Sequence, residues 1–367
     1  MSHFTWHSDL VVTVVPGEPL PMELCNRLQS HHRQLRNHYG QTEVPLMHLG
    51  LAADTTTVFV VGAGSGAPRG ASVRLFWHRF YGTIALDSLQ TREVNRREAN
   101  VPRNVPRNVP RNVPLAQRLG LGTSGIRDVM LLLTALQFGY RLLDTAAFYG
   151  NEDVVGNAVQ RAVEEQLVGS KHDIAVTTKV WWSELGYTKT KRSVTQSLER
   201  LGMSSVDTVL LHWPGRWLSN DVIRNRMLRE ESWKALEELQ QAKQVRQIGV
   251  SNFTQKHLEE LAAVSPSVPA VNQIEVHPYC QQKDLVRYCQ DCGIGVQAYS
   301  PLASGQLQLL KDPLILQVAQ AHGLSPAQVV LKWTVVDLSP GEMEAFAALD
   351  RRRPCDVTGL TSPERIA

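Results

Sequence analysis

The alternation of apolar and polar positions is the clearest structural signal in this chain, and it extends from about residue 115 to residue 336. Seven short apolar runs have the length and the β-branched content of buried strands. Between these runs, apolar residues recur every three or four positions, which predicts amphipathic helices. The predicted strands are residues 118–123, 140–146, 174–181, 206–213, 247–252, 270–276 and 295–302.

Strands that alternate with helices predict a parallel β/α architecture. The repeat of about 31 residues per unit matches a TIM-type (β/α)8 barrel, which needs roughly 250 residues for eight units. A doubly wound open sheet is the competing architecture. It needs a glycine-rich phosphate turn after its first strand, and only Ser-Gly-Ile follows Thr123. We therefore predict an α/β barrel that is incomplete, with seven recognisable β/α units.

The remainder of the chain has a different pattern. Residues 1–100 contain short apolar runs without a sustained period, and residues 101–112 repeat VPRN. Proline lacks an amide donor and biases the preceding residue away from helix, so the repeat predicts an extended, solvated linker. We expect an extension of unknown structure at 1–100, a linker at 101–112, a barrel at 113–350 and a polar tail at 351–367. On this interpretation the barrel does not depend on residues 1–112 for its stability.

Composition narrows the function classes. The 38 Lys and Arg residues and the 35 Asp and Glu residues leave a net charge of +3. This excess is too small to demand nucleic acid or an anionic membrane as a partner. The five cysteines are too few and too scattered for a disulfide scaffold, and their odd number favours a reducing compartment. No apolar run reaches the roughly 18 residues of a membrane span, so we expect a cytoplasmic protein without a membrane partner.

Four polar side chains are predicted at or just beyond successive strand ends: Asp144, Tyr149, Lys179 and His212. The carboxyl ends of parallel strands share one face of a barrel, so these side chains should converge there. Each alone has an ordinary structural explanation, such as an aspartate that caps the next helix. Four of them on successive strand ends are much harder to obtain by chance.

The four side chains form a coherent chemical group. A free tyrosine has a pKa near 10, and a neighbouring lysine ammonium is expected to lower it. An aspartate beside the lysine would keep the lysine charged, and an imidazole can donate a hydrogen bond to a carbonyl oxygen. The set suits protonation of an oxygen while hydride arrives at its carbon. Because no side chain donates hydride, a nicotinamide cofactor is implied.

Longer motifs carry a specific resemblance. GYRLLDTAAFYGNEDVVGNAV, at residues 139–159, resembles the first signature of the aldo-keto reductase superfamily, and GMSSVDTVLLHWP, at 202–214, resembles its second. TTKVW, IGVSNF, VNQIEVHPY and AYSPLASG are similar to later strand ends of that family, in the family's order. The similarity is nearest to the small monomeric reductases of aldehydes, dicarbonyls and prostaglandin-like carbonyls. It implies an NADPH-dependent monomer, with NADH as the second candidate cofactor, that reduces a small carbonyl substrate.

The resemblance also implies residue roles. Tyr149 would be the general acid, Lys179 would tune its pKa, Asp144 would pair with Lys179, and His212 would orient the carbonyl. Residues implied to contact the cofactor are Gly122, Thr123, Ser251, Asn252, Gln273, Tyr299, Ser300 and Leu302. Trp181 and Trp182 would form a wall of the substrate pocket, and no metal is expected.

One family element is missing from the chain. The family closes its barrel with an eighth strand, a proline-lysine-serine turn and a helix that carries an arginine, which together clamp the 2′-phosphate of NADP. Here Trp333 is followed by Thr-Val-Val and then by DLSPGEMEAFAALD, which resembles the final helix of the family. A different hypothesis is therefore a catalytically impaired barrel remnant that acts as an interaction protein. If a substitute clamp exists, its first candidates are Arg351, Arg352, Arg353 and Arg365.

Two further motifs favour ordinary structure. VFVVGAGSGA, at residues 58–67, fits a dinucleotide-binding fingerprint on paper, with Asp87 at the expected spacing. However, Pro68 and Gly70 interrupt the helix that should follow, so a separate nucleotide-binding module is the weaker hypothesis. Cys289 and Cys292 lie on a predicted helix without a second pair of ligands, which favours a structural role over zinc or redox chemistry.

Overall fold

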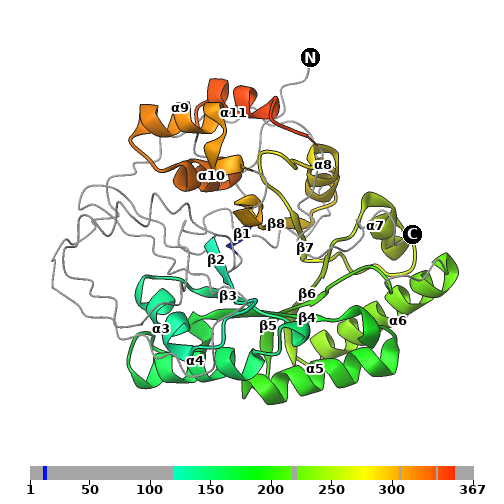
Figure 1. Cartoon of the computed structure of the whole chain (residues 1–367). Helices are drawn as coiled ribbons and strands as arrows, with labels where there is room; N and C mark the ends of the chain where they lie inside the picture. Colours follow the sequence, from blue (N-terminus) through cyan, green and yellow to red (C-terminus); the bar gives the residue numbers. More distant parts are fainter. Residues whose placement is uncertain (1–10, 15–118, 217–220, 306–307, 336–337, 352–367) are drawn as a thin grey trace, which may run out of the picture.

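The computed structural model describes residues 11–14, 119–216, 221–305, 308–335 and 338–351. Its centre is a closed barrel of parallel strands in the order β1 to β8 (Figure 1). The strands are β1 Val11–Val14, β2 Leu119–Gly122, β3 Leu142–Asp144, β4 Ala175–Val180, β5 Val206–Leu211, β6 Val245–Ser251, β7 Val271–Glu275 and β8 Gly295–Tyr299. The predicted barrel class is thereby confirmed. The seven strands predicted from the apolar runs are β2 to β8, and each lies within two residues of its predicted start.

The first strand was not foreseen. β1 belongs to the segment interpreted as an extension, and it pairs in parallel with β2 on one side and with β8 on the other. It occupies the position that the missing eighth unit would have filled. The expected barrel at 113–350 therefore leaves out one of the strands of the closed ring, whereas the effect of residues 1–112 on stability stays a prediction. A run of four apolar and β-branched residues does not reveal which distant strands it will pair with, so sequence pattern could not place it.

Helices surround the barrel on several sides (Figure 1). They are α3 Val129–Gln137, α4 Glu152–Glu164, α5 Tyr187–Leu201, α6 Val222–Gln241, α7 Gln255–Ala262, α8 Lys283–Asp291, α9 Pro313–His322, α10 Pro326–Val335 and α11 Pro340–Ala347. Short 3-10 turns are η2 Ala147–Tyr149, η3 Lys171–Asp173, η4 Trp182–Glu184, η5 Ala303–Gly305 and η6 Leu309–Lys311. Figure 1 shows α3 to α6 along one side of the barrel and α9 to α11 on another.

Local sequence sets several helix ends. Asp128 caps α3, where its carboxylate accepts a hydrogen bond from the amide of Met130 at 2.8 Å. Ser339 and Glu342 form a capping box at the start of α11, which pairs two amides that would otherwise lack partners. Gly202 follows α5 with φ of 62°, a left-handed conformation that glycine adopts without steric cost. These signals agree with the helices predicted from apolar spacing.

Close packing between α4 and α5 depends on one glycine. A β-carbon at Gly156 would lie 2.1 Å from the carbonyl oxygen of Leu201, far inside van der Waals contact. The absence of a side chain lets the two helices approach, and Val155 and Val159 beside it are fully buried. This contact holds the helix that follows Tyr149 against the helix that follows β4.

Several sequence predictions lie outside the described residues: the linker at 101–112, the GxGxxA motif at 58–67, and Arg352, Arg353 and Arg365 of the tail. Within the described ranges, no helix is both long enough and apolar enough to cross a membrane.

Candidate active site

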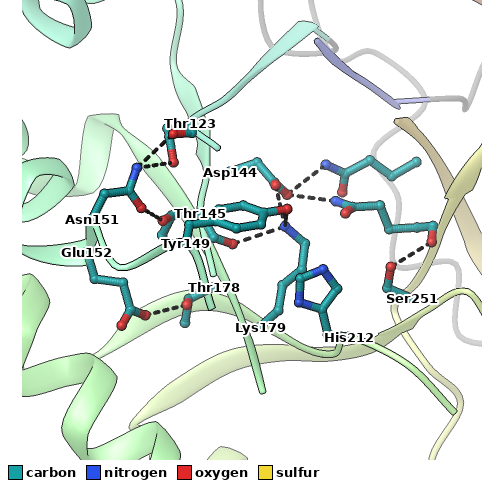
Figure 2. A network of polar contacts seen from close by, with 12 residues as sticks. Thr123, Asp144, Thr145, Tyr149, Asn151, Glu152, Thr178, Lys179, His212 and Ser251 are labelled. Carbon is teal, nitrogen blue, oxygen red and sulfur yellow. Dashed lines mark hydrogen bonds and ion pairs between the residues drawn. The ribbon is translucent and has the colours of Figure 1, made fainter. Parts of the chain in front are cut away.

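The four predicted catalytic side chains meet at the carboxyl ends of the strands, as Figure 2 shows. Asp144 is the last residue of β3, Lys179 lies on β4, His212 follows β5, and Tyr149 ends the turn η2. The Lys179 ammonium donates to the Asp144 carboxylate, to the carbonyl oxygen of Thr145 at 3.0 Å and to the Tyr149 hydroxyl at 3.4 Å. The Tyr149 and His212 rings are 5.7 Å apart between centroids. The predicted convergence is thus present in the structure.

Burial controls the charge state of Tyr149. Burial raises the pKa of Tyr149 above its ordinary value, and the opposing effect of the Lys179 charge does not outweigh it. The sequence-based expectation of a lowered pKa was therefore wrong in its net direction, although Lys179 acts with the expected sign. The reason is that desolvation disfavours a phenolate. A raised pKa keeps the phenol protonated at neutral pH, which is the form that can donate a proton.

Lys179 is kept charged at this site, whereas His212 is kept neutral. Burial alone would lower the pKa of Lys179, but Asp144 and Tyr149 together raise it, so the ammonium stays charged. The pKa of His212 lies well below its usual value because of burial and the nearby Lys179 charge. A neutral imidazole carries a single N–H. The buried Nδ1 of His212 has no hydrogen-bond partner among the described residues, so the ring keeps unused hydrogen-bonding capacity at the site.

Two glutamines complete the surroundings of Asp144. The amide of Gln273 on β7 donates to Asp144 Oδ2 at 2.6 Å, and that of Gln297 on β8 approaches the same oxygen at 3.4 Å. Gln273 was predicted as a cofactor contact, whereas Gln297 was not singled out. Gln297 lies on β8, two residues before Tyr299. Because side chains alternate along a strand with a period of two, the sequence could have placed both on one face of the sheet.

A buried asparagine links the loop after β2 to the loop of Tyr149. The Asn151 amide donates to the carbonyl oxygen of Thr123 at 2.7 Å, and its Oδ1 accepts from Thr145 Oγ1 at 2.8 Å (Figure 2). The same amide also donates to the carbonyl oxygen of Ile126 at 3.1 Å. The side chain is fully buried. Sequence reasoning missed Asn151, although it lies two residues after Tyr149 in the first signature.

The buried carboxylate of Glu152 contacts β4, the strand that carries Lys179. Glu152 accepts a hydrogen bond from Thr178, the residue before Lys179. Its other oxygen pairs with Arg200 of α5, at 2.7 Å from Nε. The Glu152 side chain is buried and Arg200 is partly exposed. This pair fixes α4, α5 and β4 relative to one another, close to the catalytic group.

The predicted cofactor contacts form a second polar group next to the first. Ser251 Oγ donates to the carbonyl oxygen of Gln273 at 2.9 Å. The Asn252 amide donates to the carbonyl oxygen of His212 at 3.0 Å, and the Tyr299 hydroxyl donates to Asn252 Oδ1 at 2.8 Å. Amide and hydroxyl groups of this kind can recognise a carboxamide, and the half-buried Tyr299 ring offers a flat surface for stacking. The donor set therefore fits a nicotinamide.

The loop after β8 has an unusual backbone. Ser300, Ala303 and Ser304 have φ values of 46°, 57° and 49°, in a left-handed region that costs non-glycine residues roughly 1 kcal/mol or more each. Such residues cluster at ligand-binding sites. Ser300 and Leu302, the predicted pyrophosphate contacts, are both buried here. Gly122 and Thr123 stand at the end of β2, where the amide of Thr123 donates to the carbonyl oxygen of Asp144 at 2.8 Å.

Aromatic side chains border the catalytic group. The Trp181 ring lies edge-on to His212 with centroids 5.0 Å apart, and Trp182 lies 6.0 Å from Trp181. Phe148, which sequence reasoning did not select, stacks on Trp181 at 3.8 Å and remains 59% exposed. An aromatic pair with one exposed ring beside a polar centre is suited to contact with an apolar substrate group.

Arg351 and Cys289, which the sequence also singled out, have defined surroundings in the structure. Arg351 lies over the ring of Tyr279 at 3.7 Å, and Tyr279 donates to Asp312 at 2.7 Å. The Arg351 guanidinium lies 4.0 Å from the Asp312 carboxylate, and its side chain is 56% exposed. Cys289 is buried, and burial raises the pKa of its thiol to about 12, which agrees with a structural role. Across the described ranges, no cluster of three metal-ligating side chains occurs.

Comparison with known proteins identifies the family. The Aldo/keto reductase family model matches residues 119–349, and this chain belongs to that family. A glyoxal reductase of Bacillus subtilis is 40% identical over 199 residues, which cover 54% of this chain and 66% of that protein. A 9,11-endoperoxide prostaglandin H2 reductase of Trypanosoma cruzi is 39% identical over 223 residues, covering 59% and 74%. A crystal structure of a Bombyx mori aldo-keto reductase in complex with NADP superimposes with a TM-score of 0.58 at 26% identity, covering 65% and 91%.

Proposed function

We propose that this chain reduces aldehyde or ketone carbonyls to alcohols with NADPH, and that Tyr149 donates the proton. The observation that supports this most is the contact of the Tyr149 hydroxyl with the Lys179 ammonium, which is itself held by Asp144. Family membership and the names of the similar reductases support the same class of reaction.

The cofactor would occupy the second polar group. NADPH supplies a hydride when it is bound. Ser251, Asn252 and Gln273 would hold the carboxamide, and the Tyr299 ring would stack on the nicotinamide. Gly122, Thr123, Ser300 and Leu302 would border the rest of the molecule. The crystal structure of the Bombyx mori relative in complex with NADP supports this choice of cofactor.

Each of the four predicted catalytic residues would have a separate role in the reaction. His212, kept neutral by burial, donates a hydrogen bond to the substrate carbonyl oxygen and orients it. As hydride reaches the carbonyl carbon, the Tyr149 O–H bond breaks and the alcohol O–H bond forms. The phenolate left on Tyr149 is stabilised by the Lys179 ammonium, and the proton is later regained from solvent. Asp144 keeps Lys179 charged and in place.

The substrate would be a small carbonyl compound with an apolar part. Phe148, Trp181 and Trp182 border the position where the carbonyl would lie, and the first two form a stacked pair. The similar proteins are named for reduction of glyoxal and of a prostaglandin endoperoxide. The alternative of a barrel remnant with only an interaction role depended on an open barrel, and the closed ring of strands favours the enzyme.

Substitution of Tyr149 by Phe tests the proposal directly. Tyr149→Phe should abolish NADPH-dependent reduction of an aldehyde such as methylglyoxal, because it removes the proton donor while the other contacts remain. NADPH binding, measured by fluorescence titration, should stay nearly unchanged. Tyr187→Phe is a matched control, since that hydroxyl pairs with Glu238 on the helices instead. Undiminished turnover in Tyr149→Phe would refute the assignment.

A further inference from the structure

Strand β1, from the N-terminal region of the chain, lies between β2 and β8 and pairs with both. Val12, Thr13 and Val14 pair with Leu119, Gly120 and Leu121 of β2. On the other edge, Val11, Val12 and Thr13 pair with Gln297, Ala298 and Tyr299 of β8. Both pairings are parallel, so β1 has the direction of every other strand in the barrel.

The neighbouring strands require such a partner. Without β1, one edge of β2 and one edge of β8 would expose unpaired backbone amides and carbonyls, and such edges recruit other strands. Val11–Val14 reads VVTV, and β-branched residues of this kind favour a pleated, buried surface. The long stretch between β1 and β2 is no obstacle, since the entropic cost of closing a loop rises only slowly with its length.

We propose that Val11–Val14 of the same chain, by pairing with both edges of the gap between β2 and β8, holds the cofactor face in shape. Two of its register partners support this. Gln297, paired with Val11, approaches Asp144. Tyr299, paired with Thr13, donates to Asn252. β2 ends at Gly122, whose partner in β3 is Asp144.

The strand that closes this barrel comes early in the sequence, whereas the family resemblance places the closing strand near the C-terminal end. The strand beside β8 precedes β2 in the sequence instead of following α10. An N-terminal segment thus takes over the structural part of the missing unit.

Hydrogen exchange of the full-length, unmodified protein tests occupancy without any variant. The amides of Val11–Val14 should exchange at least about 100-fold more slowly than those of an unstructured peptide, and with protection similar to that of β2 and β8. Sedimentation should show a monomer. Exchange at the rate of an unstructured chain would overturn the proposal. Protection of Val11–Val14 that is present in a dimer and lost when dilution gives monomers would overturn the assignment of the strand to the same chain, since two copies would then exchange strands.

A proline in the strand tests the consequence for the site. Val12→Pro removes an amide at the position that pairs with both Leu119 and Ala298. Exchange in Leu119–Gly122 and Gly295–Tyr299 should accelerate at least about tenfold, and the NADPH dissociation constant should rise several-fold. Val12→Ile keeps the β-branched side chain and should match the unmodified protein. Unchanged exchange in both strands of Val12→Pro would overturn the proposal. If that variant fails to fold, the exchange of the unmodified protein still decides.

The NADPH readout rests on the proposed function, whereas the exchange readout does not. Protected amides in a protein that binds no NADPH would contradict the proposed function alone. Strong NADPH binding together with unprotected amides in Val11–Val14 would contradict the strand assignment alone.

Discussion

Asn151 shows how one side chain connects two parts of the catalytic face. Its amide bonds to backbone carbonyls in the loop after β2, and its carbonyl oxygen accepts from Thr145 beside Asp144. The Asn151 side chain is fully buried, so these hydrogen bonds are made away from solvent. Asn151 therefore positions Thr123 and the turn of Tyr149 without belonging to the reacting group.

We expect Asn151→Ala to lower both stability and activity. The free energy of unfolding should fall by about 3 kcal/mol, because several buried polar groups lose their partner. The ratio kcat/KM for an aldehyde should fall roughly tenfold or more, because the Tyr149 turn and the cofactor loop lose their fixed relation. Thermal unfolding and steady-state kinetics below the melting temperature measure the two effects.

Gln281→Ala is the matched control for that prediction. The Gln281 amide is also buried, and it donates to the carbonyl oxygens of Pro278 and Phe346 away from the catalytic group. This variant should lose stability but keep kcat/KM. Equal losses of kcat/KM in the two variants would mean that Asn151 acts through general stability alone.

At the scale of elements, the contact between α4 and α5 is the clearest dependence on a single residue. Glycine within a helix usually costs stability, so a change to alanine normally adds about 0.5–1 kcal/mol. At Gly156 the added methyl group would overlap the Leu201 carbonyl. The helices would have to separate, with strain carried to Glu152 at the start of α4 and its partner Arg200 in α5.

We expect Gly156→Ala to destabilise the protein by about 2 kcal/mol, a decrease in Tm of about 5 °C. Gly341→Ala in α11 is the control, because a β-carbon there would meet no atom within 4 Å. That substitution should leave Tm unchanged or raise it. Differential scanning calorimetry separates the two, and a stabilised Gly156→Ala protein would show that the helices do not pack as described.

At the scale of the whole molecule, the missing β/α unit should affect cofactor choice more than catalysis. The described residues bring Asp144, Tyr149, Lys179 and His212 together next to the groups that would meet the nicotinamide. In contrast, Arg351, one candidate for a substitute clamp, packs on Tyr279 near Asp312. The carboxamide contacts are common to NADPH and NADH, so they cannot discriminate between the two cofactors.

We therefore expect weak selectivity for NADPH over NADH. Each lost charge-assisted hydrogen bond to a phosphate removes about 1.5–3 kcal/mol, and two lost bonds correspond to about a hundredfold in affinity. Fluorescence titration with both cofactors should give dissociation constants within about tenfold of each other. Tight binding that strongly favours NADPH would contradict this, and Arg351, Arg352, Arg353 and Arg365 would then be the residues to substitute.

The sequence by itself determined the seven β/α units and the four catalytic candidates. These features are local: apolar spacing sets each element, and Asp144, Tyr149, Lys179 and His212 stand at or just beyond element ends. Parallel strands then bring those ends together whatever the details of packing.

Only the tertiary structure decided the rest, because it depends on groups that are distant in the chain. Val11–Val14 could be recognised as a barrel strand only once the free edges of β2 and β8 were in place. The pKa of Tyr149 is raised because burial outweighs the Lys179 charge, and burial is a property of everything packed around the ring. Gln297 reaches Asp144 across 153 positions of sequence, a contact that no local pattern contains.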